Sequence, residues 1–217
     1  FDNLKKNLIE EPAGSGLYKL NNSDSKVRFI ISTEVSCIYR QNDKTRRVHL
    51  CILAPNLEAA AKINKGLADR GAKLASDGRP ILGMSAKDIV QIVLESDKKC
   101  MIIPAHVWTP WFAVFGSKSG FDSLQECFEE LTPHIKAIET GLSSDPFMNW
   151  RLSELDDLAI VSNSDAHSGP QIGREANVME LKERSYDEVI DVIFSKDKNR
   201  FLYTIEFYPE EGMYHVD

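Results

Sequence analysis

Short apolar runs alternate with longer amphipathic segments along most of the chain, and this alternation predicts the main elements. An apolar run bounded by polar residues is typical of a buried strand, whereas apolar residues three and four apart indicate a helix. Strands alternating with helices predict parallel βαβ units and therefore the α/β class. The predicted strands span 27–31, 47–53, 100–105, 135–138, 158–161, part of 174–181, and 201–205. The predicted helices span 1–10, 56–71 (capped by Asn56), 85–96 (capped by Ser85, with Asp88 three residues on), 122–131 and 186–194.

Four of the predicted strands lead into a carboxylate or imidazole side chain at or beyond their carboxyl end. These side chains are Glu34, His106, Glu139 and Asp165. The carboxyl ends of parallel strands lie on one rim, and a closed barrel would bring the four side chains together. Carboxylates and imidazoles are ligands for zinc and manganese, so the pattern predicts a metal site. For Glu139 the sequence leaves two roles open, metal ligand or anchor for another ligand.

The segment from Val161 to Ser168 carries Asp165 and His167 two residues apart, just past the last of these apolar runs. On an extended backbone this spacing places both side chains on one side, as convergent ligands require. The alternative is an Asp that orients a surface His in a turn. His49 lies inside the strand predicted at 47–53, where a ligand and a hydrogen-bonded core histidine are both open. The remaining histidines, His134 and His215, are expected at a helix end and in solvent.

An aromatic loop follows His106 directly. Trp108, Trp111 and Phe112 would stack on a nucleobase, with Ser117 and Lys118 facing phosphate, or else the loop is a hydrophobic lid. Arg151 and Arg174 are further phosphate candidates, for which the alternative is an ordinary surface or ion-paired arginine.

Composition narrows the class of protein. The 217 residues contain 42% hydrophobic residues, enough for one sizeable core, and carry a formal net charge of −7. This charge argues against nucleic-acid binding through a broad basic surface, although bound dications would reverse the local field. The four cysteines form no CxxC pair and lie mostly in apolar runs, as reduced thiols of a cytoplasmic protein would. No apolar run approaches the length needed to cross a membrane.

The order of the candidate metal ligands along the chain can be compared with the motifs of known metalloenzyme families. Thr33-Glu34-Val35, the lone His49, His106 and Asp165-Ala166-His167 resemble the motifs of the PHP (polymerase and histidinol phosphatase) metallophosphoesterases. The resemblance implies a PHP-type distorted (β/α)7 TIM-like barrel with two or three Zn²⁺ and/or Mn²⁺ ions at its carboxyl rim. It implies that Glu34 bridges metals, that His49, His106, Asp165 and His167 complete the shell, and that Asp165 and His167 are catalytic.

Longer stretches resemble one branch, the endonuclease Q family, which nicks DNA 5′ to deaminated bases such as uracil and hypoxanthine. They run over 105–112, 115–124, 139–145 and 162–168. This resemblance implies DNA containing deaminated bases as the partner. Two other functions stay open: a small-molecule phosphatase of the histidinol-phosphate type, and a degenerate PHP module that binds without catalysis. The oligomeric state is not predicted.

One departure from the family pattern is clear. The family begins with a His-x-His strand and then an Asp-and-His segment, and neither occurs here. We therefore expect residues 1–217 to form one partial PHP domain, truncated at both ends and lacking its first strand or strands. Lost ligands would weaken metal binding, and an open barrel would expose a sheet edge.

Overall fold

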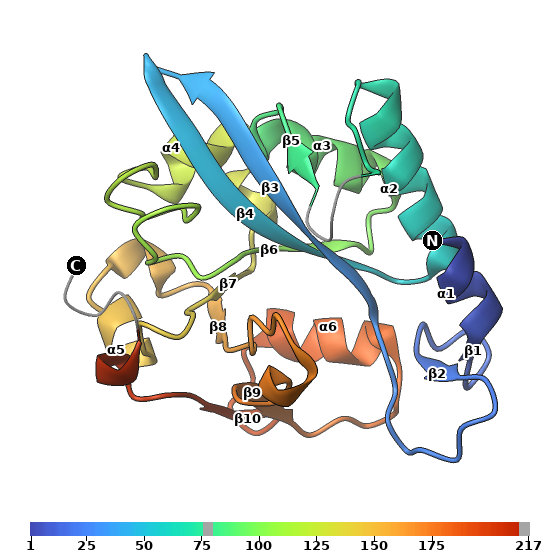
Figure 1. The fold of residues 1–217 in the computed structure, drawn as a ribbon. Helices are drawn as coiled ribbons and strands as arrows, with labels where there is room; N and C mark the ends of the chain where they lie inside the picture. Colours follow the sequence, from blue (N-terminus) through green and yellow to red (C-terminus); the bar gives the residue numbers. More distant parts are fainter. Residues whose placement is uncertain (76–79, 213–217) are drawn as a thin grey trace.

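The computed structural model describes residues 1–75 and 80–212. The chain is a mixed α/β protein in which helices flank several small sheets (Figure 1). The α-helices are α1 (Asp2–Asn7), α2 (Leu57–Asp69), α3 (Ala86–Ser96), α4 (Leu124–Phe128), α5 (Pro146–Asn149) and α6 (Tyr186–Ser195). Short 3₁₀ turns are η1 (Glu129–His134), η2 (Ser153–Leu155), η3 (Gly169–Gln171) and η4 (Pro209–Glu211). No helix of the described residues is long and apolar enough to cross a membrane.

The strands form one four-stranded sheet and three pairs. Their bounds are β1 (Leu8–Glu10), β2 (Tyr18–Leu20), β3 (Ile31–Gln41), β4 (Lys44–Ala54), β5 (Ile81–Leu82), β6 (Met101–Pro104), β7 (Ala137–Glu139), β8 (Ala159–Val161), β9 (Ala176–Met179) and β10 (Phe201–Ile205). The larger sheet has the order β5-β3-β4-β6, and the pairs are β1-β2, β7-β8 and β9-β10. β7 and β8 run parallel, whereas β3, β4 and β6 pair in antiparallel fashion.

A long β-hairpin dominates the fold and corrects the prediction for its amino-terminal strand. β3 and β4 pair over their whole lengths, and the tip of this hairpin projects from the molecule (Figure 1). The strand predicted at 27–31 ends where β3 begins, so Glu34 lies within a strand and not beyond its end. The hairpin turns at Asn42 and Asp43, both with positive φ, as a two-residue turn of type I′ requires. Antiparallel pairing here also replaces the uniformly parallel sheet that the alternation predicted.

The sheets follow one another in an arc and do not close. Backbone hydrogen bonds continue the arc beyond each sheet, from Ala105 to His49, from Val107 to Glu139 and from Thr140 to Val161. Across the next gap, the Asn177 side chain on β9 bonds both backbone groups of Ser162, just past β8. Among residues 1–75 and 80–212 no closed barrel forms, so the predicted seven-stranded barrel is not confirmed as a closed structure.

Two hydrophobic clusters hold the arc in place. The larger joins one face of β3 and β4 to α2 and α3 through residues such as Leu50, Ile52, Ile63 and Ile89. The smaller joins β6, β7 and β8 to α6 and includes the buried Tyr186. Because the other face of β4 stays outside the larger cluster, it is available for polar residues.

Most helices match their predicted positions because the capping signals are local. Asn56 accepts a hydrogen bond from the Ala59 amide, and Ser85 forms the predicted capping box with Asp88. The prediction over 122–131 is wrong in extent: the α-helix stops at Phe128, and the following turn, which contains Pro133, is 3₁₀. The helix predicted over 1–10 ends at Asn7, after which the chain enters the β1-β2 hairpin. Cys37, Cys100 and Cys127 are buried free thiols, and half-buried Cys51 lines the cavity described below.

Candidate metal centre

The hairpin supplies two neighbouring polar side chains on one face. Glu34 pairs with Cys51 across the strands, and Ser36 pairs with His49. Residues directly opposite in a ladder share a face, and residues two apart along a strand do so as well. Glu34 and His49 therefore lie diagonally opposite each other on the face of the β3-β4 hairpin that the larger hydrophobic cluster leaves open.

His106 approaches the same point from the end of β6. Its backbone has φ of 30°, an unusual value for a residue with a side chain. The His106 Nδ1 atom lies 3.0 Å from the Thr109 hydroxyl, so the opposite nitrogen, Nε2, faces the hairpin. When one ring nitrogen of a histidine binds a metal, a hydrogen bond at the other nitrogen, such as this one to Thr109, fixes the orientation of the ring.

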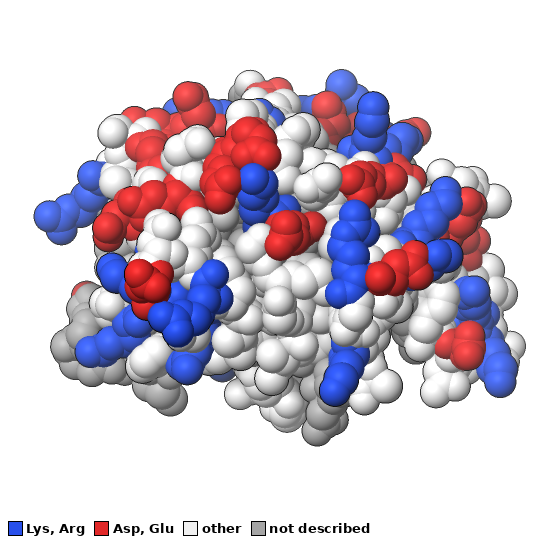
Figure 2. Space-filling view, turned by 90° about the horizontal axis from the view of Figure 1, so that it is seen from above, with Lys and Arg blue, Asp and Glu red and all other residues white. Residues whose placement is uncertain are grey.

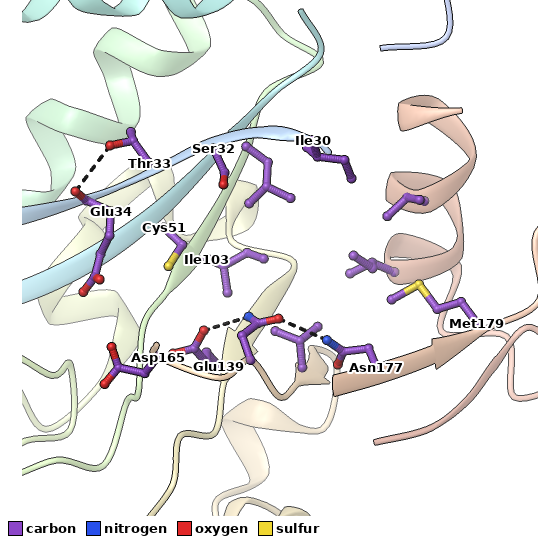
Figure 3. A pocket seen from close by; sticks show the side chains of 15 residues that line it. Ile30, Ser32, Thr33, Glu34, Cys51, Ile103, Glu139, Asp165, Asn177 and Met179 are labelled. Atoms are coloured by element: carbon purple, nitrogen blue, oxygen red, sulfur yellow. Dashed lines mark hydrogen bonds between the residues drawn. The ribbon is translucent and has the colours of Figure 1, made fainter. Parts of the chain in front are cut away.

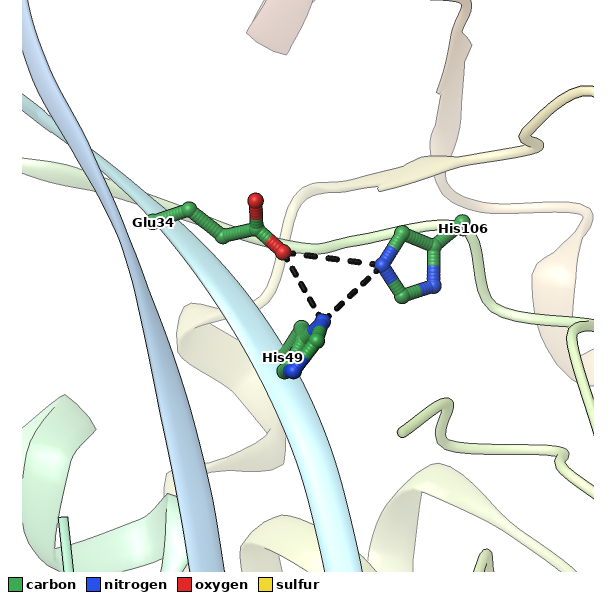
Figure 4. A group of neighbouring side chains, drawn as sticks. All are labelled: Glu34, His49 and His106. Carbon is green, nitrogen blue, oxygen red and sulfur yellow. Dashed lines mark hydrogen bonds and ion pairs between the residues drawn. The ribbon is translucent and has the colours of Figure 1, made fainter. Parts of the chain in front are cut away.

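The three side chains meet in a compact triangle (Figure 4). The His49 Nδ1 atom lies 2.9 Å from a Glu34 carboxylate oxygen and 3.1 Å from His106 Nε2, and that oxygen lies 3.5 Å from His106 Nε2. One carboxylate oxygen and two imidazole nitrogens, all within 4.8 Å of one another, suit a divalent cation such as Zn²⁺. The donor set therefore fits a metal ion.

Glu139 contacts the backbone of one member of this triangle, His106. It is the last residue of β7 and is 3% exposed. One of its carboxylate oxygens accepts a hydrogen bond from the His106 amide at 3.1 Å, and the other accepts one from the Asn163 side chain at 2.7 Å. Burial raises the pKa of Glu139 above its usual value, against the effect of these bonds. Glu139 thus holds the backbone of the candidate ligand His106 and is not itself a member of the three-residue cluster.

The acidic surroundings also act on His106. Burial alone would lower its pKa, but the hydrogen bond with Glu34 and the charges of Glu139, Glu34 and Asp165 raise it. The site therefore favours positive charge at this position, as expected where a cation is to be held.

A cavity of about 560 Å³ opens beside the triangle (Figure 3). Its polar end carries the carboxylates of Glu34, Glu139 and Asp165, together with Asn163 and Asn177. The other end is apolar and is lined by side chains of β4, β6, β9 and α6, including Leu53, Ile103, Met179 and Ile193. Asp165 is thus placed in the same cavity as Glu34, although it is not part of the three-residue cluster.

Asp165 lies in a turn with strained backbone that hydrogen bonds from a neighbouring side chain hold in place. Asp165 has φ of 43°, and the Arg174 side chain donates hydrogen bonds to the carbonyl groups of Ser164 and Asp165. Arg174 thus contacts the Asp165 backbone. The His167 side chain is 66% exposed, and its Nδ1 atom lies 2.9 Å from the Asp165 carbonyl oxygen. The structure therefore does not bring His167 to the triangle.

The aromatic loop divides into packed and exposed rings. Trp108 stacks on Phe115 with centroids 4.8 Å apart, and its indole N–H donates to Asn149. Phe112 stacks on the His49 ring at 4.5 Å. Trp111, by contrast, faces solvent, and 46% of the residue is exposed.

The other predicted substrate contacts lie at the surface. Ser117 and Lys118 are exposed beyond Trp111 in the same loop, and Arg151 is exposed after α5. His134 ends η1, as its predicted helix-end position requires, and His215 lies outside the described residues.

Solved structures resemble this architecture over nearly the whole chain. PfuEndoQ, the lesion-specific endonuclease from Pyrococcus furiosus, superposes with a TM-score of 0.79 at 26% identity, covering 97% of this chain and 48% of that one. Endonuclease Q in complex with a 27-mer duplex substrate, which has an abasic lesion at the active site, gives 0.81 at 27% identity, covering 99% and 50%. The chain is therefore similar in fold to endonuclease Q over nearly its whole length. The resemblance predicted from the sequence motifs is thereby confirmed.

Sequence comparisons are consistent with this assignment and less informative about function. Uncharacterized protein YqxK of Bacillus subtilis strain 168 is 28% identical over 170 residues, covering 77% of this chain and 42% of that protein. Uncharacterized protein MJ0043 of Methanocaldococcus jannaschii is 32% identical over 116 residues, covering 50% and 14%. No family model matches the sequence. The chain therefore spans less than half of these relatives and about half of the solved endonuclease Q chains.

Several contributors to the candidate site were not predicted from the sequence. Thr109 orients His106, and Asn163 holds Glu139. Gly141, with φ of 82°, lets the loop after β7 pass against His106, because a Cβ atom there would lie 2.8 Å from the His106 Cβ. A Gly shortly after a strand was the available signal for such a close approach.

Proposed function

We propose that this protein is a metal-dependent phosphoesterase that hydrolyses phosphodiester bonds in DNA, nicking 5′ to deaminated bases such as uracil and hypoxanthine. The observation that carries the proposal is the triangle of Glu34, His49 and His106 beside a cavity in an endonuclease Q-like chain. The lesion class rests on the motif resemblance, and DNA as partner also rests on the neighbour that holds a duplex.

Glu34, His49 and His106 would hold Zn²⁺ or Mn²⁺ directly. Asp165 lies in the same cavity and would join them, whereas His167 must first turn its exposed ring inward. When bound, the cations supply stabilisation for negative charge that develops on the phosphate oxygens. We further infer that the arc of strands is part of a PHP-type (β/α)7 barrel and that residues 1–217 belong to one such domain.

The protein residues have separate tasks in this proposal. Asp165 would accept the proton of the attacking water, since a carboxylate at the polar end of the cavity is a suitable general base. Glu139 would keep His106 in place through the amide hydrogen bond. Arg174 would keep Asp165 in its strained turn through two backbone carbonyl groups.

The charge distribution shapes how DNA would bind. On the face seen from above, basic and acidic side chains are interspersed and no broad basic tract is visible (Figure 2). With a net charge of −7, nonspecific attraction to the phosphate backbone is weak. Binding must therefore rest on bound cations and on a few well-placed contacts near the cavity.

The first prediction concerns metal content and nicking. Protein purified without chelator should contain at least one zinc or manganese ion per chain and should nick uracil- or hypoxanthine-containing duplexes. Asp165→Asn should abolish nicking and retain the fold, because Asn keeps the volume and loses the charge. Elemental analysis, gel assays of labelled duplexes and thermal melting measure the three quantities.

Glu58→Gln, on the exposed surface of α2, is the matched control and should nick normally. Less than one metal per chain would contradict the site. Metal binding with hydrolysis of p-nitrophenyl phosphate but no nicking would favour the small-molecule phosphatase. Metal binding without either activity would favour a noncatalytic module.

A further inference from the structure

The face of the hairpin that carries Glu34 and His49 continues outward to an arginine. Arg47 lies two residues before His49 on β4, so the two side chains leave the same face. Two residues of a strand span roughly 7 Å. Arg47 therefore lies next to His49 on this face, on the side of the hairpin turn at Asn42 and Asp43.

The guanidinium of Arg47 rests on the aromatic loop. It lies 4.8 Å from the centroid of the Trp111 ring and 5.8 Å from that of Phe112. Phe112 in turn stacks on His49, so guanidinium, aromatic ring and candidate ligand form one continuous contact. Arg46, its neighbour, points the other way: it is buried, donates to the Gly120 carbonyl and packs over Phe121. The two adjacent arginines thus have different environments.

Backbone hydrogen bonds fix this arrangement. The Arg47 amide donates to the Ser119 carbonyl at 3.2 Å, and the His49 amide donates to the Phe112 carbonyl at 2.9 Å. The Phe112 amide donates to the Ser119 hydroxyl, which also lies 3.4 Å from the Arg47 carbonyl. The aromatic loop is therefore tied to β4 on both sides of its turn, and Arg47 is held at a set distance from His49.

The charge of Arg47 is not neutralised within the described structure. Over residues 1–75 and 80–212 it forms no ion pair with a carboxylate, whereas Arg28, Arg70 and Arg200 all do. A guanidinium stacked on an aromatic ring keeps its edge N–H groups free for an oxyanion. Beside a centre suited to a scissile phosphate, the complementary ligand is a second phosphate of the same strand.

We propose that Arg47 binds a backbone phosphate of the DNA strand next to the phosphate at the metal centre, with Trp111 stacked against the guanidinium. The proposal rests on the proposed function and adds a specific contact to it. It also gives Phe112 a role as a positioning residue for His49 and Arg47, in place of the base-stacking role expected from the sequence.

The test measures DNA binding over a range of salt concentrations. Asp165→Asn serves as the background so that the duplex, fluorescently labelled and containing uracil, stays intact. Adding Arg47→Ala should weaken binding about tenfold and reduce the slope of log affinity against log salt by about one, as loss of one phosphate contact requires. Arg47→Lys should keep the slope and lose part of the affinity, because it keeps the charge without the planar stacking.

Arg70→Ala, at the residue that caps the carboxyl end of α2 and pairs with Glu95, is the charge-matched control and should leave both quantities unchanged. If Arg47→Ala weakens binding with an unchanged slope and a lower melting temperature, Arg47 only holds the loop and the proposal fails. An unchanged affinity and slope would also overturn it. If the unsubstituted protein neither binds nor nicks the uracil-containing duplex, the proposed function itself fails, and that result is distinct from the other two.

Discussion

Three of the eight described non-glycine residues with positive φ lie around the candidate site. His106, Phe112 and Asp165 have φ values of 30°, 63° and 43°, and all three are near the cavity or the triangle. Such conformations cost about 1–3 kcal/mol each and persist where surrounding contacts hold them. Here the holding contacts are identifiable: Glu139 bonds the His106 amide, and Arg174 bonds the Asp165 carbonyl.

Gly141 offers a test of this local geometry. Gly141→Ala should destabilise the protein by more than the roughly 1–2 kcal/mol of a left-handed residue, because its new Cβ atom would displace His106. Zinc affinity should fall as well, since His106 is a candidate ligand. Chemical denaturation and zinc titration measure the two effects.

Gly14 provides the matched control for that substitution. It has a similar φ of 77°, and a Cβ atom added there would have nothing within 4 Å, so Gly14→Ala should cost only the conformational penalty. Equal losses of stability for the two variants, with zinc affinity intact, would show that Gly141 does not constrain His106.

At the scale of single residues, the sequence was sufficient to name Glu34, His49 and His106 as candidates. Each is a metal-ligand residue type inside or beside an apolar run, which makes an uncompensated polar group costly. The partners Thr109 and Asn163 were not identifiable, because common polar residues acquire a role only when the fold brings them to a ligand. For Arg47 the same holds: its significance depends on Trp111, sixty-four residues away in the chain.

Among the elements, the β3-β4 hairpin determines the site most directly. Side chains alternate between faces along a strand, so a slip of one residue in pairing would move Glu34 and His49 to opposite faces. The two-residue turn at Asn42 and Asp43 fixes this pairing.

The turn can be tested by substitutions at Asp43. Asp43→Gly should leave stability equal or higher by up to about 1 kcal/mol, and Asp43→Val should lower it by about 1–2 kcal/mol, because only the β-branched residue resists positive φ. Urea denaturation measures both. The ion pair of Asp43 with Arg40 is exposed and adds little. Equal destabilisation by Gly and Val would mean that a side-chain contact of Asp43, and not the turn conformation, is what matters.

This hairpin was the main element that sequence reasoning misplaced. The residues of β3 mix apolar and polar types without a continuous apolar run, and the predicted strand was set on the apolar residues just before them. The Asn42-Asp43 pair was the missed signal, since this residue pair favours a tight turn. By contrast, α2, α3 and α6 were predictable because their caps and apolar periods are local.

For the whole molecule, a bound cation should contribute measurably to stability. A ligand present at one hundred times its dissociation constant stabilises by about 2.7 kcal/mol if it binds only the folded state. For a chain of this size that corresponds to roughly 5–10 °C in melting temperature. We therefore expect a chelator to lower the melting temperature by roughly 5–10 °C and added zinc to restore it.

Glu34→Gln should remove most of the zinc-dependent shift, because it replaces the charged ligand at nearly constant volume. Glu58→Gln on α2 should retain the full shift. A zinc-dependent shift that is equal in both variants would place the stabilising ion elsewhere on the molecule. The barrel expected from the family resemblance is not confirmed as a closed structure. Local sequence patterns could not decide this point, because closure depends on long-range strand pairing that they do not encode.

The positions of the three candidate ligands along the chain have a consequence for chain entropy. Glu34 and His49 already lie in one hydrogen-bonded hairpin, so a cation that joins them restricts the unfolded chain only slightly. His106 follows His49 by 57 residues, and the intervening chain includes α2, β5 and α3. A cation bridging these two histidines would close that long loop, and the entropic cost of such closure grows with the logarithm of loop length. The ion would thus act as a cross-link that ties the helical layer between its ligands to the hairpin.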